Sequence, residues 1–214
     1  ADAPTFDAHR TTWSPAGDII NMVQDTLVAL DWDGKTPIPY LAKSWDISAD
    51  GRTYTFKLHD DVTFCSGKKL TAEDVVYTIT RLKSPDTKGP FAWRAGEVKS
   101  LRAIDATTVA YELSEPFSDL LLQLTMFTNV IMNKENVEAL GKDYGVKGLD
   151  GTGPWCFVNW QPRTEINLRR NEVASVVSTR NVETAMKSGT GDLGLYVEDD
   201  RQQRAGLFLR DVAY

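Results

Sequence analysis

This 214-residue chain has neither a long hydrophobic run nor an excess of positive charge. It contains 24 Lys and Arg against 30 Asp and Glu, a net charge of -6, which would repel nucleic-acid phosphates and an anionic membrane surface. Its most apolar stretch, residues 120–132, is interrupted by polar side chains and is shorter than the ~20 apolar residues that a membrane span requires. We expect this stretch to be a buried helix that runs into a strand.

Cysteine and histidine are scarce as well, which argues against a zinc site. The chain has only Cys65 and Cys156, no Cys-x-x-Cys pair, and only His9 and His59 as nitrogen ligands. The cysteines form either one disulfide, worth roughly 4–5 kcal/mol for so long a loop, or two buried free thiols. The chain starts with Ala-Asp-Ala-Pro, which resembles the product of signal-peptide cleavage. Export would favour the bridge.

Two β-hairpins are predicted from alternating apolar residues on either side of a turn. In residues 44–58 the turn is Asp50-Gly51, and Tyr54, Phe56 and Leu58 then share one face. Residues 98–113 repeat the pattern around Asp105. Further strands are expected at residues 154–160 and 165–170, with a turn at Pro162, and a short strand at residues 62–65.

Helices are expected in several segments between these strands. Residues 71–82 form the clearest one, because Thr71 is a good N-cap whose hydroxyl can accept from a backbone N–H near Asp74, and Val75, Ile79 and Leu82 recur at helical spacing. Other helices are predicted to start within residues 114–124, to span 133–145 with a stop at Gly141, and to open the segment 179–197 before a turn and a strand. The pattern predicts an α+β or mixed α/β fold.

The order of these features resembles a known family. Matching pieces are "FDAH" near the start, "DTLVALDWDGKTPIPYLAKSWDISADGRTYTFKLHDDVTFCSGKKLTAEDVVYTITRL" (25–82), "TVAYELSEPF" (108–117), "GTGPWCFVNW" (151–160) and "INLRRNE" (166–172). They resemble the extracytoplasmic solute-binding proteins of family 5, which serve ABC importers for peptides, nickel and related solutes. The chain departs from the family pattern at His59, Asp61 and Cys65.

The resemblance implies a single lobe of the type II periplasmic-binding-protein fold with a small accessory α+β domain. Residues 1–32 and 151–214 correspond to the incomplete main lobe, and residues 33–150 to the accessory domain. Nothing in the chain matches the second lobe. The paired cysteines at 65 and 156 are consistent with a bridge between two neighbouring strands.

The resemblance also implies the candidate site residues. By position in the family these are Thr12, Trp13 and Ser14 in the early loop, Trp93 after the first accessory helix, and Thr128 and Asn129 in a later loop. Indole rings suit solute binding because they combine a large apolar area with one N–H donor. Packing within the lobe remains the alternative for Trp13 and Trp93. Trp45, Trp155 and Trp160 lie in predicted strands and are expected in the core.

The predicted function is solute capture for an ABC importer, with peptides, metal chelates or similar small solutes as ligands and a membrane permease as partner. We expect a monomer outside the cytoplasm, without cofactor or catalytic residues. One alternative is a hydrolase using a carboxylate or a thiol, in which His59 or His9 would activate a free Cys65. Another is a fragment that binds only a partner protein. The short "GTG" at 151–153 predicts backbone freedom, with small side chains and positive φ, rather than phosphate binding.

Overall fold

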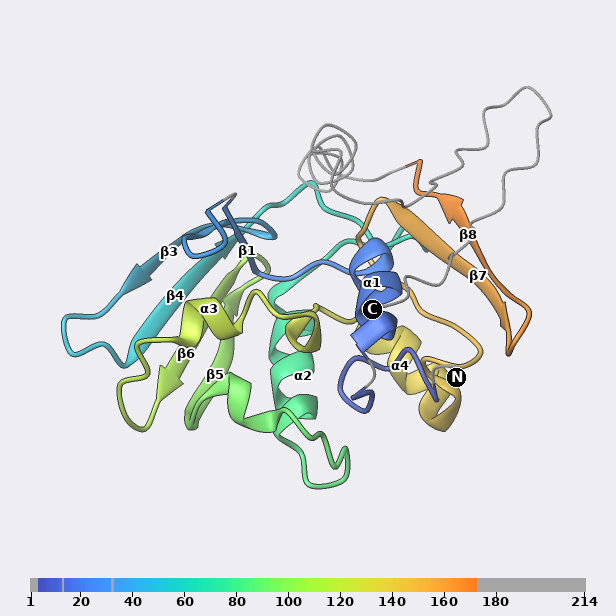
Figure 1. Cartoon of the computed structure of the whole chain (residues 1–214). Helices are drawn as coiled ribbons and strands as arrows, with labels where there is room; N and C mark the ends of the chain where they lie inside the picture. Colours follow the sequence, from blue (N-terminus) through green and yellow to red (C-terminus); the bar gives the residue numbers. More distant parts are fainter. Residues whose placement is uncertain (1–3, 13, 32, 173–214) are drawn as a thin grey trace.

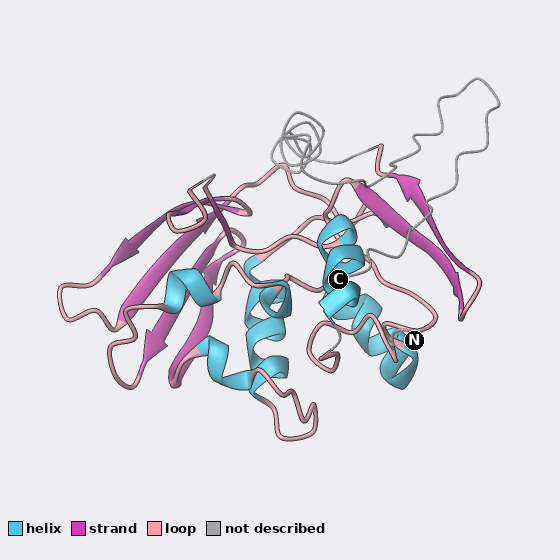
Figure 2. Ribbon diagram, in the orientation of Figure 1, coloured by secondary structure: helices cyan, strands magenta, loops and turns pink. Residues whose placement is uncertain are grey.

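The computed structural model describes residues 4–12, 14–31 and 33–172. In this part of the chain, strands lie at two sides of the molecule and helices fill the space between them (Figures 1 and 2). A four-stranded antiparallel sheet has the order β3-β4-β6-β5, and two-stranded sheets are formed by β1 with β2 and by β7 with β8. This mixed α and β architecture agrees with the predicted fold class.

Both predicted hairpins are confirmed and together build the larger sheet. Strands β3 (Ala42–Ile47) and β4 (Thr53–Leu58) form the first hairpin, and β5 (Val98–Asp105) and β6 (Thr108–Leu113) form the second. The hairpins join through β4 and β6, whose register places Phe56 opposite Val109. The inward face of β4 carries the predicted set Tyr54, Phe56 and Leu58, all buried.

Helix α2 (Ala72–Lys83) is also confirmed, with Thr71 as its N-cap. The carboxylate of Asp74 accepts from both the backbone N–H of Thr71 at 3.1 Å and the Thr71 hydroxyl at 3.0 Å. Thr71 and Asp74 thereby form a capping box at the start of the helix, with Thr71 as the predicted N-cap. Val75, Ile79 and Leu82 form the predicted buried stripe.

The remaining elements are short. They are α1 (Ser14–Val23), β1 (Val28–Leu30), β2 (Pro37–Pro39), the 3₁₀ helices η1 (Ala92–Ala95), η2 (Phe127–Asn129) and η3 (Gly141–Asp143), α3 (Leu120–Gln123), α4 (Lys134–Leu140), β7 (Trp155–Gln161) and β8 (Glu165–Arg170). The predicted hairpin of β7 and β8 and the stop at Gly141, where φ is 54°, are confirmed. Residues 62–65 form no strand; only Thr63 makes an isolated bridge, to Lys69. The predicted elements at 179–197 lie outside the described residues.

Residues 120–132 do not form the predicted helix that runs into a strand. The helix ends at Gln123, and the apolar residues 130–132 run between two cores. Val130 and Met132 point into one core and Ile131 into the other. Their backbone groups find mixed partners: the N–H of Ile131 donates to the carbonyl of Asp25, and that of Met132 to the hydroxyl of Thr78. The alternation resembles a strand, and Val130 makes an isolated antiparallel bridge with Thr26, but the pairing does not extend into a sheet.

Two clusters of buried side chains hold the fold together. The first cluster, between the four-stranded sheet and α2, collects apolar residues from Leu27 to Ile131. The second cluster collects apolar residues from 6–23 and 130–149, with Tyr77 of α2 and side chains of β7 and β8 packed against it. In Figure 1, α2 stands between the sheet and the pair α1 and α4. Trp155 is buried, and Trp45 and Trp160 pack against the clusters, as expected for core tryptophans.

The division into a main lobe (1–32 and 151–214) and an accessory domain (33–150) stays a prediction. The hydrophobic clusters divide the chain differently, because most buried apolar residues of 130–149 pack with the N-terminal segment, and only Ile131 packs with the sheet.

Candidate functional site

The early loop and the 127–129 turn meet at the start of α1. A Cβ atom placed on Gly17 of α1 would lie 3.1 Å from Cδ1 of Phe127, so the Phe127 ring packs directly on the helix. This contact sets η2 beside the first turn of α1, which follows the predicted loop. Thr12 is exposed just before the helix, Ser14 is its first residue, and Trp13 lies outside the described residues.

Thr128 and Asn129 are buried in η2, and each has one polar atom without a partner in the described part of the chain. The Asn129 amide nitrogen donates to the main-chain carbonyl of Gln123 at 2.9 Å. No described group hydrogen-bonds Oγ1 of Thr128 or Oδ1 of Asn129, although neither atom is exposed. Buried polar atoms without partners are infrequent and destabilising in folded proteins. Two adjacent residues of η2 therefore each bury a polar atom that has no partner among the described residues.

Trp93 lies in η1 with 53% of its surface exposed. Its neighbour Arg94 has its guanidinium carbon 4.8 Å from the centroid of the Trp93 ring and 5.0 Å from that of Phe91. Nη1 of Arg94 donates to Oε1 of Gln123 at 2.8 Å. A chain of contacts therefore runs from Trp93 through Arg94 and Gln123 to Asn129.

The structure thus connects Trp93 to Asn129 through Arg94 and Gln123, the last residue of α3, and it places η2 near the start of α1. Sequence reasoning missed Arg94 and Gln123. A usable signal was present for Arg94, since "FAWR" puts two aromatic residues within three positions of an arginine. None was available for Gln123, whose position at the end of a four-residue helix depends on the fold. The ligand roles of all six candidate residues stay predictions.

Residues 151–153 carry the chain back past the end of α1 in close contact. A Cβ atom on Gly151 would lie 1.9 Å from the carbonyl oxygen of Val23, and one on Gly153 would lie 2.7 Å from that of Met22. Between them, Thr152 donates its hydroxyl to Asp25 at 2.8 Å. The expectation of small side chains is confirmed. The expectation of positive φ is wrong, because neither glycine has it; close backbone approach is the reason for glycine here.

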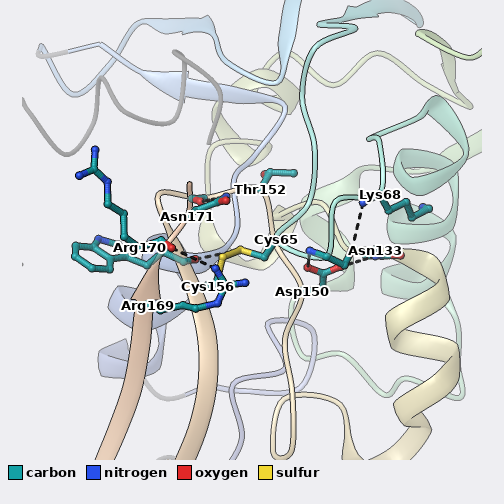
Figure 3. Close-up of a disulfide and its surroundings, with 12 residues drawn as sticks. Cys65, Lys68, Asn133, Asp150, Thr152, Cys156, Arg169, Arg170 and Asn171 are labelled. Atoms are coloured by element: carbon teal, nitrogen blue, oxygen red, sulfur yellow. Dashed lines mark hydrogen bonds between the residues drawn. A yellow bond between two sulfur atoms is a disulfide. The ribbon is translucent and has the colours of Figure 1, made fainter. Parts of the chain in front are cut away.

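Cys65 and Cys156 form a disulfide, with their Cα atoms 5.7 Å apart. The predicted link between two neighbouring strands needs correction, since only Cys156 lies in a strand, at the start of β7, whereas Cys65 lies in a turn. Figure 3 shows the bridge joining these two segments. The backbone N–H of Cys65 also donates to the carbonyl of Gly151 at 2.8 Å. The bridge and the hydrogen bond fix the same turn to the returning chain.

A buried carboxylate beside the disulfide reinforces this junction (Figure 3). Asp150 accepts from the backbone N–H of Ser66 at 3.0 Å, from the Ser66 hydroxyl at 2.6 Å, and from the side-chain amide of Asn133 at 2.6 Å. Asn133 is in turn the N-cap of α4, where it accepts from the N–H of Glu135 at 3.1 Å. The network connects the 65–66 turn to α4, and its donors occupy the carboxylate that a catalytic role would require free.

The N-terminal segment is attached to α2 by a second buried carboxylate. Asp7 accepts from Arg81 of α2 at 2.6 and 3.0 Å. Nδ1 of His9 lies 2.9 Å from the same guanidinium, so this nitrogen accepts and the proton is on Nε2, which has no described partner. Burial above all, and then the charge of Arg81, lowers the pKa of His9 to about 3. His9 is therefore neutral and structural in role.

The described residues contain neither a metal-binding cluster nor a membrane-spanning helix. Within residues 4–12, 14–31 and 33–172, no three His, Cys, Asp or Glu side chains are grouped as they would be around a metal ion. None of the helices described there has the length and apolar character to cross a bilayer.

Comparisons with known proteins give one consistent result. The profile of the bacterial extracellular solute-binding proteins, family 5 Middle, matches residues 36–173, more than half of the chain. The glutathione-binding protein GsiB of Pectobacterium atrosepticum is 35% identical over 144 residues, which are 67% of this chain and 28% of GsiB. The dipeptide-binding protein of Escherichia coli is 30% identical over 153 residues, 62% of this chain and 29% of that protein.

Structural comparison agrees with these matches. The substrate-binding domain of an oligopeptide ABC transporter from Bacillus anthracis superposes with a TM-score of 0.75 and 26% identity, covering 80% of this chain and 36% of that one. The fold is accordingly that of a type II periplasmic binding protein, of which this chain forms part of one lobe. The chain spans less than a third of the length of the two curated relatives. It belongs to the bacterial extracellular solute-binding proteins of family 5.

Proposed function

We propose that this chain is part of the solute-capturing component of an ABC importer, with peptides or related small solutes as ligands. Its partner is then a membrane permease, and its location is extracytoplasmic. The relatives described as binding glutathione and dipeptides support a small, peptide-like ligand. The residues proposed to contact it are Thr12, Trp13, Ser14, Trp93, Thr128 and Asn129, and residues 33–150 are proposed as the accessory domain.

The observation that carries this proposal is the contact chain from Trp93 to Asn129. An indole with half of its surface exposed supplies apolar area for a solute. At the other end of this series of contacts, Thr128 and Asn129 have a hydroxyl and an amide oxygen without partners among the described residues. An apolar surface beside a few unsatisfied polar groups is typical of small-molecule sites.

The hydrolase alternative has less support. Its thiol version is contradicted, because Cys65 is bound to Cys156 and cannot serve as a nucleophile. Its carboxylate version has no specific observation in its favour, since Asp7, Asp74 and Asp150 each accept hydrogen bonds that hold the fold together.

Titration of the 214-residue chain with solutes tests the proposal. The probes are alanyl-phenylalanine and S-methylglutathione, whose blocked thiol spares the disulfide, and the signals are the indole N–H resonances in two-dimensional NMR spectra. We expect the Trp93 resonance to shift saturably, with a dissociation constant of roughly 0.1 mM or weaker, because affinity in such receptors depends on closure of a second lobe.

Two variants serve as the comparison. Trp93→Ala should weaken binding at least about fivefold, whereas Trp45→Phe, in the sheet away from η1, should leave it unchanged. The proposed function is wrong if no indole resonance responds to either probe at millimolar concentration. Nanomolar affinity would instead contradict the single-lobe interpretation.

A further inference from the structure

Arg94 is held in place by its neighbours on both sides. Its guanidinium lies over the rings of Phe91 and Trp93, with its central carbon 5.0 and 4.8 Å from the two centroids. Nη1 is directed to Oε1 of Gln123 at 2.8 Å. Stacking on aromatic rings and a hydrogen bond in the guanidinium plane together restrict the side chain to one orientation. These contacts hold the guanidinium between the two rings in the unliganded chain.

The charge of Arg94 is not matched by an acid in the part of the chain that the structure describes. Among the described residues, no carboxylate lies within 4 Å of it, in contrast to Arg81, which pairs with Asp7. Nε of Arg94 is buried and makes no hydrogen bond within this part of the chain. Burial lowers the pKa of Arg94 from its ordinary value. In a chain with 30 acidic and 24 basic residues, a partly buried cation without an acidic partner leaves a place for an external anion.

We propose that Arg94 binds a carboxylate of the solute through its Nε and Nη2 edge and so gives the site a preference for anionic solutes. This inference rests on the proposed function. Gln123 occupies Nη1, which leaves the opposite edge for a bidentate contact of the kind that arginine makes with carboxylates. Because Nε is covered, one flanking ring must turn aside, and Trp93 is the more exposed of the two. The displaced indole then covers the apolar part of the same solute.

A matched pair of ligands tests the carboxylate contact. Alanyl-phenylalanine and its C-terminal amide differ only in that group, and each is titrated into the 214-residue chain while the indole and arginine Nε–H resonances are followed by NMR. We expect the free acid to bind about tenfold more tightly than the amide, in line with a charge-assisted hydrogen bond. It should also shift the Arg94 Nε–H signal, which the amide should not.

Two substitutions separate charge from geometry. Arg94→Gln should reduce the preference for the acid over the amide to about twofold or less, and Arg94→Lys should retain only part of that preference. Arg102→Gln, on the exposed side of β5, is the matched control and should behave as the wild type. Thermal unfolding of each variant checks that the fold is intact.

The outcomes distinguish the role of Arg94 from the proposed function. Equal binding of acid and amide by the wild type, or an unchanged preference in Arg94→Gln, overturns the role of Arg94 and leaves the proposed function standing. Failure of both ligands to shift any resonance of the wild type overturns the proposed function and this inference with it.

Discussion

His9 is a fully buried histidine that is held neutral beside a guanidinium. Its Nδ1 accepts from Arg81, which also pairs with Asp7, so protonation would place a second positive charge against Arg81. Burial and that charge lower its pKa from 6.5 to about 3. In the unfolded chain His9 regains its ordinary pKa, so between these two values the unfolded state binds a proton that the native state does not.

The first prediction concerns stability in acid. The contribution of His9 is fully present above about pH 6.5 and is lost as the pH falls from 6.5 towards 3, at up to about 1.4 kcal/mol per pH unit. His9→Gln keeps a neutral acceptor but cannot bind the proton. Urea unfolding curves between pH 7.5 and 4 should therefore show that the variant loses less of its free energy of unfolding than the wild type.

His59 provides the control for this measurement. It is partly exposed, and His59→Gln retains His9, so it should keep the acid-dependent loss that His9 causes. If the free energy of unfolding falls equally with pH for the wild type and His9→Gln, native His9 binds the proton as readily as it does in the unfolded chain, contrary to our interpretation.

At the scale of elements, the close packing of residues 151–153 against α1 depends on the absence of a side chain at Gly151. The carbonyl of Val23 occupies the position where a Cβ on Gly151 would be, at 1.9 Å. Backbone hydrogen bonds hold both sides in place, from Gly153 to Val23 and from Cys65 to Gly151. We therefore predict that Gly151→Ala lowers the free energy of unfolding by more than about 4 kcal/mol, since the clash is with backbone on two fixed elements.

Gly67→Ala is the matched comparison. Gly67 has φ of 86°, and a Cβ atom added there would have no described atom beyond its chain neighbours within 4 Å. A methyl group there therefore adds only backbone strain, about 1–2 kcal/mol. Urea unfolding followed by tryptophan fluorescence measures both variants. If Gly151→Ala is no worse than Gly67→Ala, the approach of the two chain segments is not as close as described.

Elements whose signals are local in sequence could be predicted. The hairpins turn on Asp50-Gly51 and Asp105, and α2 starts at Thr71 with an apolar stripe at helical spacing; each signal lies within the element it specifies. The candidate site was foreseen only in part. Arg94 needs Gln123, and Gln123 is 29 positions away, so no local pattern brings them together.

The prediction for residues 120–132 was wrong for a related reason. The run of three apolar residues Val130, Ile131 and Met132 indicates a segment that is buried on both faces. The segment is indeed buried on both faces. They belong to two different cores, however, and Met132 bonds the hydroxyl of Thr78 on a helix where a strand partner was expected. Which partner a backbone group finds depends on the tertiary arrangement, which periodicity does not contain.

At the scale of the whole molecule, the disulfide connects the two hydrophobic clusters. Cys65 follows Val62 and Phe64, which belong to the first cluster, and Cys156 precedes Phe157, which packs against the second. The bridge spans 91 positions, a long loop for the unfolded chain to close. Noncovalent contacts cross the same junction, among them the bonds of Ser66 to Asp150.

The last prediction follows from this arrangement. Replacing both cysteines by serine should lower the free energy of unfolding by roughly 4–5 kcal/mol, because the unfolded chain regains the freedom that the bridge removes. The Ser66–Asp150 bonds stay in place, so the native fold should persist at pH 7 with an unchanged near-ultraviolet circular dichroism spectrum. Urea curves of the double variant, and of the wild type with and without a reductant, supply the measurement. Reduction that leaves the urea midpoint unchanged, or thiols that react in the denatured but unreduced protein, would show that the bridge does not couple the clusters.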